Sequence, residues 1–262
     1  VEYERTRLKG MINTPIGEKS ALRVAAMWGE GDGWLENKGA PDDGNDLNRY
    51  NIHAQYLVVP SDDLDINFSV TYGHIDEICC SVTTAAGEVF GPGGITPVPD
   101  EVSDLITHDT FEAVNDSTDA VYSAEVNWSF NDMKLTSITS YQDFDLDSTV
   151  DGDFIEFAFL AIVTEVEIEA WTQELRLAGN TDKLEWTVGA FYSDEEITRN
   201  RAFVWGADIG FTPFPLVPGP GSLDLMSQEG TSWSVFGQGT YALTEALSVT
   251  AGIRYNDEDK DG

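Results

Sequence analysis

The sequence predicts an all-β protein, an antiparallel up-and-down transmembrane β-barrel to which this chain contributes about ten strands. Three observations lead to this fold class. Apolar and polar residues alternate with a period of two along most of the chain, short turns and long connections follow each other strictly in turn, and helical periodicity is almost absent. Because successive side chains of a strand point to opposite faces, such alternation gives each strand one apolar and one polar face.

The strands share a recognisable form. Between Tyr122 and Phe130, apolar residues at even positions alternate with Ser, Glu, Asn and Ser. Three other segments begin with Leu and end at an aromatic residue about eight positions later, namely 64–72, 184–192 and 247–255. Eight steps of about 3.3 Å give roughly 26 Å of strand. When tilted, such a strand matches the apolar band of an outer-membrane barrel, which is roughly 25 Å tall.

Taken in order, the strands form about five hairpins. Their turns lie at 15–20, 60–63, 131–134, 179–182 and 243–246, and all but the last contain Pro, Gly, Asn or Asp, which supply turn geometry. The first strand, residues 2–13, alternates poorly and is placed by its position. The segment 134–147 is ambiguous about which face is apolar.

Long connections join one hairpin to the next, at about 30–46, 77–118, 148–164 and 196–228. All short turns are therefore expected at one end of the sheet and all long connections at the other. Outer-membrane barrels show this asymmetry between short periplasmic turns and longer extracellular loops. The alternative is a soluble acidic β-sandwich that binds carbohydrate or calcium, but sandwiches have turns every 8–12 residues at both ends. Long connections, one of which reaches roughly forty residues, favour the barrel.

Composition excludes several functional classes. The chain has 47 acidic and 14 basic residues and a formal net charge of -33, so nucleic-acid phosphates would be repelled. With 13 Phe, 9 Tyr and 7 Trp it is too aromatic for a disordered acidic chain. Its only histidines, His53, His74 and His108, have no metal-ligand spacing, and no nucleophile–base pair is evident, so we do not expect an enzyme.

A series of phrases resembles one known family. They are Leu8-Lys-Gly-Met-Ile-Asn-Thr-Pro, Asp32-Gly-Trp-Leu-Glu-Asn, Leu135-Thr-Ser-Ile-Thr-Ser-Tyr, Thr172-Gln-Glu-Leu-Arg-Leu-Ala, Val188-Gly-Ala-Phe-Tyr, Val235-Phe-Gly-Gln-Gly-Thr-Tyr-Ala-Leu-Thr and Leu247-Ser-Val-Thr-Ala-Gly-Ile-Arg-Tyr. In this order and spacing, the chain resembles the barrel of TonB-dependent receptors over nearly its whole length.

This resemblance implies a location, a fold and a function. Family barrels have about 22 strands, together with an N-terminal plug domain, so residues 1–262 are expected to be an internal part of the barrel domain without the plug and terminal strands. The implied function is energised uptake of a scarce nutrient across the outer membrane of a Gram-negative bacterium. A ferric siderophore is the leading ligand, with cobalamin, oligosaccharides and plant aromatics as alternatives. The implied partners are the inner-membrane TonB complex, reached through the plug, and outer-membrane lipid and lipopolysaccharide. No cofactor is implied.

Two sets of candidate site residues remain. Aromatic residues in the long connections could stack on a ligand, namely Trp34, Phe90, Phe203, Trp205 and Phe211. Carboxylates at a strand end could hold Ca²⁺, or could form a solvated acidic rim, namely Asp143, Asp145, Asp147, Asp151 and Asp153. Asp42, Asp43 and Asp46 invite the same comparison.

Two features stay open at the level of sequence. The adjacent pair Cys79–Cys80 fits a vicinal disulfide, two free thiols or a disulfide to another chain. The high acidic charge fits either divalent ions bridging to a lipopolysaccharide surface or a salt-adapted source.

Overall fold

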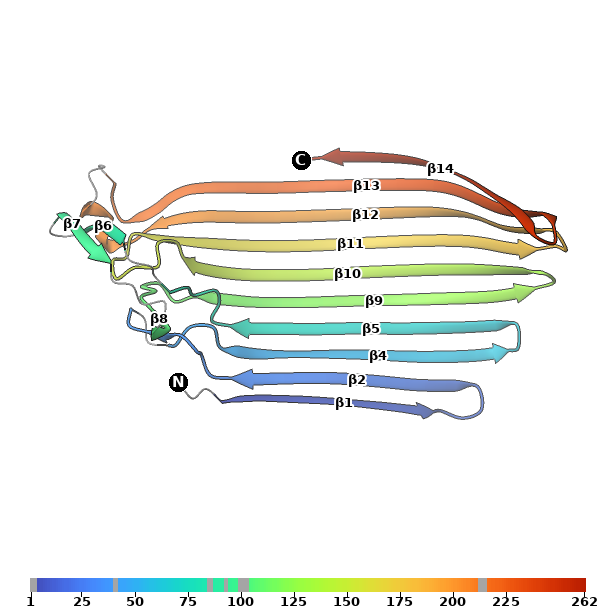
Figure 1. The fold of residues 1–262 in the computed structure, drawn as a ribbon, viewed down its shortest axis with the longest axis horizontal. Helices are drawn as coiled ribbons and strands as arrows, with labels where there is room; N and C mark the ends of the chain where they lie inside the picture. The colour runs from blue at the N-terminus through green and yellow to red at the C-terminus, as the bar shows by residue number, and fades with distance from the viewer. Residues whose placement is uncertain (1–3, 40–41, 84–86, 92–93, 99–103, 212–215) are drawn as a thin grey trace.

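The computed structural model describes residues 4–39, 42–83, 87–91, 94–98, 104–211 and 216–262 (Figure 1). Its main element is a ten-stranded antiparallel sheet in which the long strands pair in chain order. These strands are β1 (Arg5–Pro15), β2 (Ser20–Gly31), β4 (Leu47–Ser61), β5 (Leu64–Glu77), β9 (Val114–Phe130), β10 (Met133–Asp151), β11 (Leu160–Asn180), β12 (Leu184–Trp205), β13 (Gly219–Thr244) and β14 (Leu247–Asp261). The predicted series of antiparallel hairpins is confirmed, including the poorly alternating first strand.

Short turns close the hairpins at one end of the sheet, on the right in Figure 1. Asp62 and Asp63 alone separate β4 from β5, and Asn131 and Asp132 alone separate β9 from β10. Gly17 and Asn131 have positive φ angles of 73° and 52°, a conformation that Gly and Asn tolerate better than other residues.

The long connections gather at the opposite end and contain the minor elements. There β3 (Glu36–Asn37) pairs in parallel with β8 (Ile106–Thr107), β6 (Gly87–Gly91) forms a hairpin with β7 (Gly94–Val98), and a 3₁₀ helix, η2, spans Ala207–Phe211. In the part of the chain that the structure describes, no helix is long and apolar enough to span a membrane.

Two of the long connections are shorter than the sequence suggested. We expected connections at 148–164 and 196–228, but β10 and β11 stay paired up to Asp151 and Ala161, and β12 and β13 up to Trp205 and Gly219. The connections proper are residues 152–159 and 206–218. The alternation of apolar and polar residues ends before the strands do. Apolar residues alternate only where one face contacts lipid, whereas the hydrogen-bonded pairing of the strands continues beyond the lipid.

Strand register gathers an aromatic belt on the apolar face. Trp28 lies opposite Tyr50, and Tyr141 lies between Tyr122 and Trp171. Where the rings of neighbouring strands meet, their centroids are 5.4 to 6.5 Å apart. Every long strand after β1 contributes one member, and the belt is Trp28, Tyr50, Tyr72, Tyr122, Tyr141, Trp171, Tyr192, Trp233 and Tyr255. Such a belt marks the interface between membrane and water.

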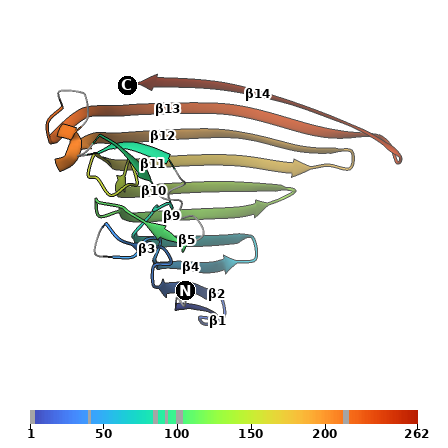
Figure 2. The same cartoon turned by 60° about the vertical axis from the view of Figure 1, so that its left-hand side comes forward.

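Between the belt and the short turns, the same face is apolar and uncovered. Leu175, Val188 and Val235 are 46 %, 46 % and 47 % exposed, and Ile253 is 80 % exposed. Figure 2 shows the strands as one layer. In a β-sandwich these side chains would be buried against a second sheet, so the described structure contradicts the sandwich alternative and fits a face turned to lipid.

The ambiguous segment 134–147 is resolved by its pairing. Leu135 lies between Trp128 and Leu177, which places odd-numbered residues of β10 on the apolar face. Ser137 and Thr139 therefore face lipid together with Gln173. Thr139 Oγ1 donates to Gln173 Oε1 at 2.6 Å, and Gln173 Nε2 donates to Ser137 Oγ and to the Glu174 carbonyl, both at 3.0 Å. Polar groups in lipid must be satisfied within the protein, and here they are.

The opposite face of the sheet is mainly polar, and we call it the polar wall. Asn127 Nδ2 donates to Asp65 Oδ2 at 3.0 Å and to Glu125 Oε1 at 2.7 Å, and Thr136 Oγ1 donates to Asn127 Oδ1 at 2.8 Å. A hollow lies beside these residues, and Asp65, Glu125, Asn127 and Arg23 are part of its lining. The expected contrast between a lipid-facing side and a wet side is thus present in the sheet.

A pair of arginine substitutions on neighbouring residues tests the two faces. We expect Val188→Arg in the intact receptor to lower the free energy of unfolding in lipid vesicles by about 2–4 kcal/mol, because a charge on the lipid face near the midplane must be desolvated. Thr187→Arg, on the polar wall, should cost less than about 1 kcal/mol. The measurement is urea unfolding followed by tryptophan fluorescence. Equal losses for both variants would contradict the assignment of the faces.

Candidate functional site: the loop cap and the upper polar wall

The long connections form one hydrogen-bonded cap at the end of the sheet opposite the short turns. We name them L1 (32–46), L2 (78–113), L3 (152–159) and L4 (206–218). L1 joins L2 through the amides of Glu36 and Lys38, which donate to the carbonyls of Leu105 and Thr107 at 3.0 Å. L4 joins L3 through the amide of Asp208, which donates to the Ala158 carbonyl at 3.0 Å. The loops therefore support one another.

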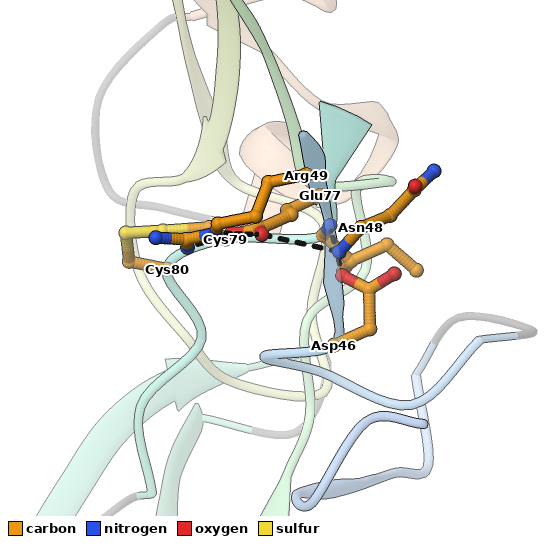
Figure 3. Close-up of polar contacts among 7 residues, drawn as sticks. Asp46, Asn48, Arg49, Glu77, Cys79 and Cys80 are labelled. Carbon is orange, nitrogen blue, oxygen red and sulfur yellow. Dashed lines mark hydrogen bonds and ion pairs between the residues drawn. A yellow bond between two sulfur atoms is a disulfide. The ribbon is translucent and has the colours of Figure 1, made fainter. Parts of the chain in front are cut away.

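An ion pair fastens the roots of L1 and L2 (Figure 3). Arg49 Nε and Nη2 donate to the two carboxylate oxygens of Glu77 at 2.6 and 2.5 Å, and the Asn48 amide donates to Glu77 Oε1 at 3.1 Å. Glu77 is 6 % exposed, so the bidentate pair also satisfies a buried charge. Beside it, Asp46 Oδ1 accepts the Ile78 amide at 2.6 Å, and burial raises the pKa of Asp46 above its usual value.

The two cysteines lie directly beyond this ion pair. The structure joins Cys79 to Cys80 as a vicinal disulfide, one of the three alternatives that the sequence left open (Figure 3). Asn45 binds the chain on both sides of the disulfide. Its backbone amide donates to the Ile78 carbonyl at 2.9 Å, its side-chain amide donates to the Ser81 carbonyl at 2.9 Å, and the Ser81 amide donates to Asn45 Oδ1 at 3.1 Å. L1 therefore holds this segment of L2 in place.

Asp151 fastens L2 to L3. It is 1 % exposed. Its Oδ2 accepts the Thr110 amide at 2.6 Å, the Thr110 hydroxyl at 3.0 Å and the Phe111 amide at 3.3 Å. Its Oδ1 accepts the amides of Asp153 and Phe154 at 3.0 and 2.8 Å. One buried carboxylate thus accepts five hydrogen bonds from two loops.

Two further carboxylates, Asp109 and Asp153, lie close to Asp151. Burial, together with the charge of Asp151, raises the pKa of Asp153 to about 7. Backbone amides oppose this shift, among them that of Leu160, which donates to Asp153 Oδ2 at 2.8 Å. Burial also raises the pKa of Asp109, which is 2 % exposed and accepts the Thr107 hydroxyl at 2.8 Å. The stability of the cap is therefore linked to protonation of Asp109 and Asp153.

The acidic run proposed for Ca²⁺ is split by the structure. Asp151 and Asp153 belong to the clamp, whereas Asp143, Asp145 and Asp147 lie on the lipid-side face of β10, beyond the aromatic belt. Their partners on β11 are all glutamates, Glu169, Glu167 and Glu165 respectively. In the described residues, no group of three or more His, Cys, Asp or Glu side chains is placed to hold a metal ion. The Ca²⁺ site and the acidic rim therefore both stay predictions for these residues.

The aromatic candidates are also divided. Trp34 lies half-buried in L1, while Phe203 and Trp205 lie in β12 rather than in a loop. The side chains of Phe90 and Phe211 are outside the described part of the structure. The structure thus brings Phe203 and Trp205 together and leaves Trp34 in a separate part of the cap.

Two arginines that the sequence reasoning missed accompany this aromatic pair. Arg199 and Arg201 precede Phe203 and Trp205 at a spacing of two, so all four share one face of β12, the face of the polar wall. The sequence does contain a signal for them. Basic residues are few, 14 in the chain, and two of them continue the spacing of two that leads to Phe203 and Trp205. The prediction of a loop at 196–228 hides this pattern, because a period of two has structural meaning only within a strand.

An apolar face with an aromatic belt, a polar wall behind it and a cap of loops at one end define the wall of an outer-membrane barrel. The TonB dependent receptor-like beta-barrel family model matches residues 33–262, and the chain belongs to this family, whose barrels lie in the Gram-negative outer membrane.

Solved structures of this family share the fold. The ferric yersiniabactin uptake receptor FyuA from Yersinia pestis matches with a TM-score of 0.71 at 15 % identity, over 98 % of this chain and 38 % of its own. The ferric citrate transporter FecA matches with a TM-score of 0.65 at 10 % identity, over 98 % of this chain and 35 % of its own. The siderophore receptor PiuA from Acinetobacter baumannii gives 0.58 at 15 % identity, over 98 % and 44 %. The chain therefore spans less than half the length of these receptors. No curated protein matches it in sequence.

Removing the clamp should loosen the cap and leave the sheet intact. For Asp151→Ala in the intact receptor we expect the amides of Thr110, Phe111 and Phe154 to exchange with solvent at least about tenfold faster, because each buried hydrogen bond to a charged group contributes about 1.5–3 kcal/mol. Hydrogen exchange followed by mass spectrometry measures this. Asp147→Ala, on the exposed face of the same strand, is the matched control. Unchanged protection in the Asp151 variant would contradict the clamp.

The cap should also become less stable as pH rises. Because the folded-state pKa of Asp153, about 7, lies above the ordinary aspartate value of 3.8, the folded cap binds a proton more tightly than the open cap does. Protection of L3 amides, corrected for intrinsic exchange, is therefore expected to be greatest at low pH and to fall between about pH 4 and pH 7. Asp153→Asn should abolish most of this pH dependence. A rise in protection with pH would have the wrong sign for this account.

Proposed function

We propose that the protein to which this chain belongs is an energised outer-membrane receptor that takes up a ferric siderophore. The observation that carries the proposal is the two-faced sheet. One face is suited to lipid up to the aromatic belt, and the other is polar and suited to a wet lumen, as in a large membrane barrel. The loop cap stands at the end where such a receptor meets the external medium.

Structural neighbours support iron chelates as the ligand class. Besides the yersiniabactin receptor, they include the alcaligin receptor FauA from Bordetella pertussis and the ferric-catecholate import receptor Fiu from E. coli K12. The ferric citrate transporter and the copper transporter OprC have the same fold, so the fold by itself does not select the ligand. The siderophore is therefore the part of the proposal that uptake experiments must decide.

In the proposed mechanism, the wall and cap described here act with a plug domain and further strands of the same receptor. The cap and plug capture the ligand from outside, and the inner-membrane TonB complex then displaces the plug. Residues 1–262 supply one part of the barrel in this scheme. Lipid and lipopolysaccharide contact the apolar face and the acidic surface above it.

A deletion strain tests the function directly. The intact receptor should fractionate with outer membranes and migrate as a heat-modifiable band in detergent. Loss of its gene should abolish uptake of at least one radiolabelled ferric siderophore, and a protonophore should reduce that uptake in the wild type to the same level, because the transport is energised.

The control is complementation with the wild-type gene and with a gene lacking the energy-coupling segment. Only the wild-type gene should restore uptake. A strain that retains uptake of every ferric chelate but loses uptake of cobalamin or of an oligosaccharide would refute the siderophore assignment while keeping the receptor class.

A further inference from the structure

The arginine–aromatic group on β12 faces the inside of the receptor. Tyr192 belongs to the belt on the apolar face, so odd-numbered residues of β12 lie on the polar wall. Arg199 is seven residues beyond Tyr192, a rise of roughly 23 Å along the strand. The four side chains of Arg199, Arg201, Phe203 and Trp205, which we call the β12 patch, therefore lie above the membrane band and away from lipid.

The β12 patch has a positive charge that the described part of the chain does not fully compensate. Arg199 Nη2 pairs with Asp224 Oδ2 at 2.9 Å. Asp224 is the residue directly opposite Arg201 on β13, yet within the described residues Arg201 forms no ion pair. The partners of the two arginines on β11, Val166 and Thr164, are uncharged. In a chain with a net charge of -33, such a cation stands out.

The two aromatic members of the patch lie next to the charge. The guanidinium carbon of Arg201 lies 5.0 Å from the centre of the Phe203 ring, which is a cation–π distance. The Trp205 indole lies against Gly221 on β13, where an added Cβ would be 2.6 Å from Trp205 Nε1. Glycine at this position makes room for the indole. Ile162 and Leu160 lie opposite Phe203 and Trp205 on β11 and give the patch an apolar flank.

Both guanidinium groups keep donor capacity that the described residues do not use. The Nε atoms of Arg199 and Arg201 are buried and have no acceptor among the described residues. Buried donors usually have partners, so an unpaired one requires an explanation. Guanidinium groups bind carboxylates and other oxyanions through parallel hydrogen bonds, and aromatic faces stack on flat ligands.

We propose that the β12 patch is a binding subsite for an anionic ligand with a flat aromatic face, the class that includes catecholate and aryl-carboxylate iron chelates. This inference deepens the proposed function and rests on it. Arg201 supplies the uncompensated charge, Arg199 stands beside it while held by Asp224, and Phe203 and Trp205 supply the stacking surface. Because the patch lies above the belt on the polar wall, a ligand meets it before the lumen.

Equilibrium binding to the purified intact receptor tests the subsite. The probes are the anionic ferric complex of 2,3-dihydroxybenzoate and a neutral ferric trihydroxamate, with tryptophan fluorescence as the readout. We expect Arg201→Gln to weaken the anionic chelate at least about tenfold and to leave any binding of the neutral chelate unchanged. Arg201→Lys should bind the anionic chelate better than Arg201→Gln but more weakly than the wild type, because lysine keeps the charge and lacks the planar pair of guanidinium donors. Phe203→Leu should weaken the anionic chelate in the same direction.

The matched control is Arg176→Gln, which removes a polar-wall arginine that pairs with Glu174 at 2.9 Å within the membrane band. It should bind the anionic chelate with wild-type affinity. Heat-modifiable migration verifies that each variant folds, and if Arg201→Gln does not fold, Arg201→Lys and Phe203→Leu decide the matter. Wild-type affinity in the folded patch variants, or an equal loss for both chelates, would overturn the proposal.

Iron-free 2,3-dihydroxybenzoate separates this proposal from the uptake function. If cells take up no ferric chelate through the receptor, the proposed function fails. Binding of the iron-free aromatic anion by the wild type, with loss in Arg201→Gln, would still support the patch. A wild-type receptor that binds neither the iron-free anion nor its ferric complex would overturn the patch whatever the outcome of the uptake experiment.

Discussion

The structure depends on one constraint, that backbone N–H and C=O groups in contact with lipid have no water to bond and must find partners within the protein. The antiparallel ladder meets this requirement across the long strands, and each strand then needs side chains suited to lipid on one face only. Even the polar exceptions obey the constraint. Gln173, on the lipid side of β11, is bonded through both its oxygen and its nitrogen.

The aromatic belt marks where that constraint ends. Below it, the outer face is apolar and the inner face polar. Above it, both faces meet water or other loops, so each can take up a separate role. The outer face of β10 and β11 places like charges such as Asp143 and Glu169 opposite each other, which water can screen. The inner face of β12 bears the arginine–aromatic patch. The cap is held by carboxylates, of which Asp151 is the central one.

The sequence predicts most of the fold and less of the site, for a physical reason. Alternation and turn residues are local signals, so strand order, hairpins and the orientation of the faces followed from them. The predicted connection 196–228 is too long at both ends, because alternation of hydrophobicity stops at the membrane while strand pairing continues. Arg199 and Arg201 lie in the part that is strand. The role of Asp151 was inaccessible for another reason. Its partners Thr110 and Phe111 lie about forty residues earlier in the sequence, and no local sequence pattern predicts a contact over that separation.

The central claim is that one face of this sheet meets lipid and the other meets water. The most direct test is a scan of single nitroxide labels at residues 184–192 of the intact receptor in lipid vesicles, with Cys79 and Cys80 replaced by serine. Accessibility to oxygen, which concentrates in lipid, should be high at even positions, and accessibility to a water-soluble nickel complex should be high at odd positions. A scan without a period of two, or with the two accessibilities exchanged, would contradict the account.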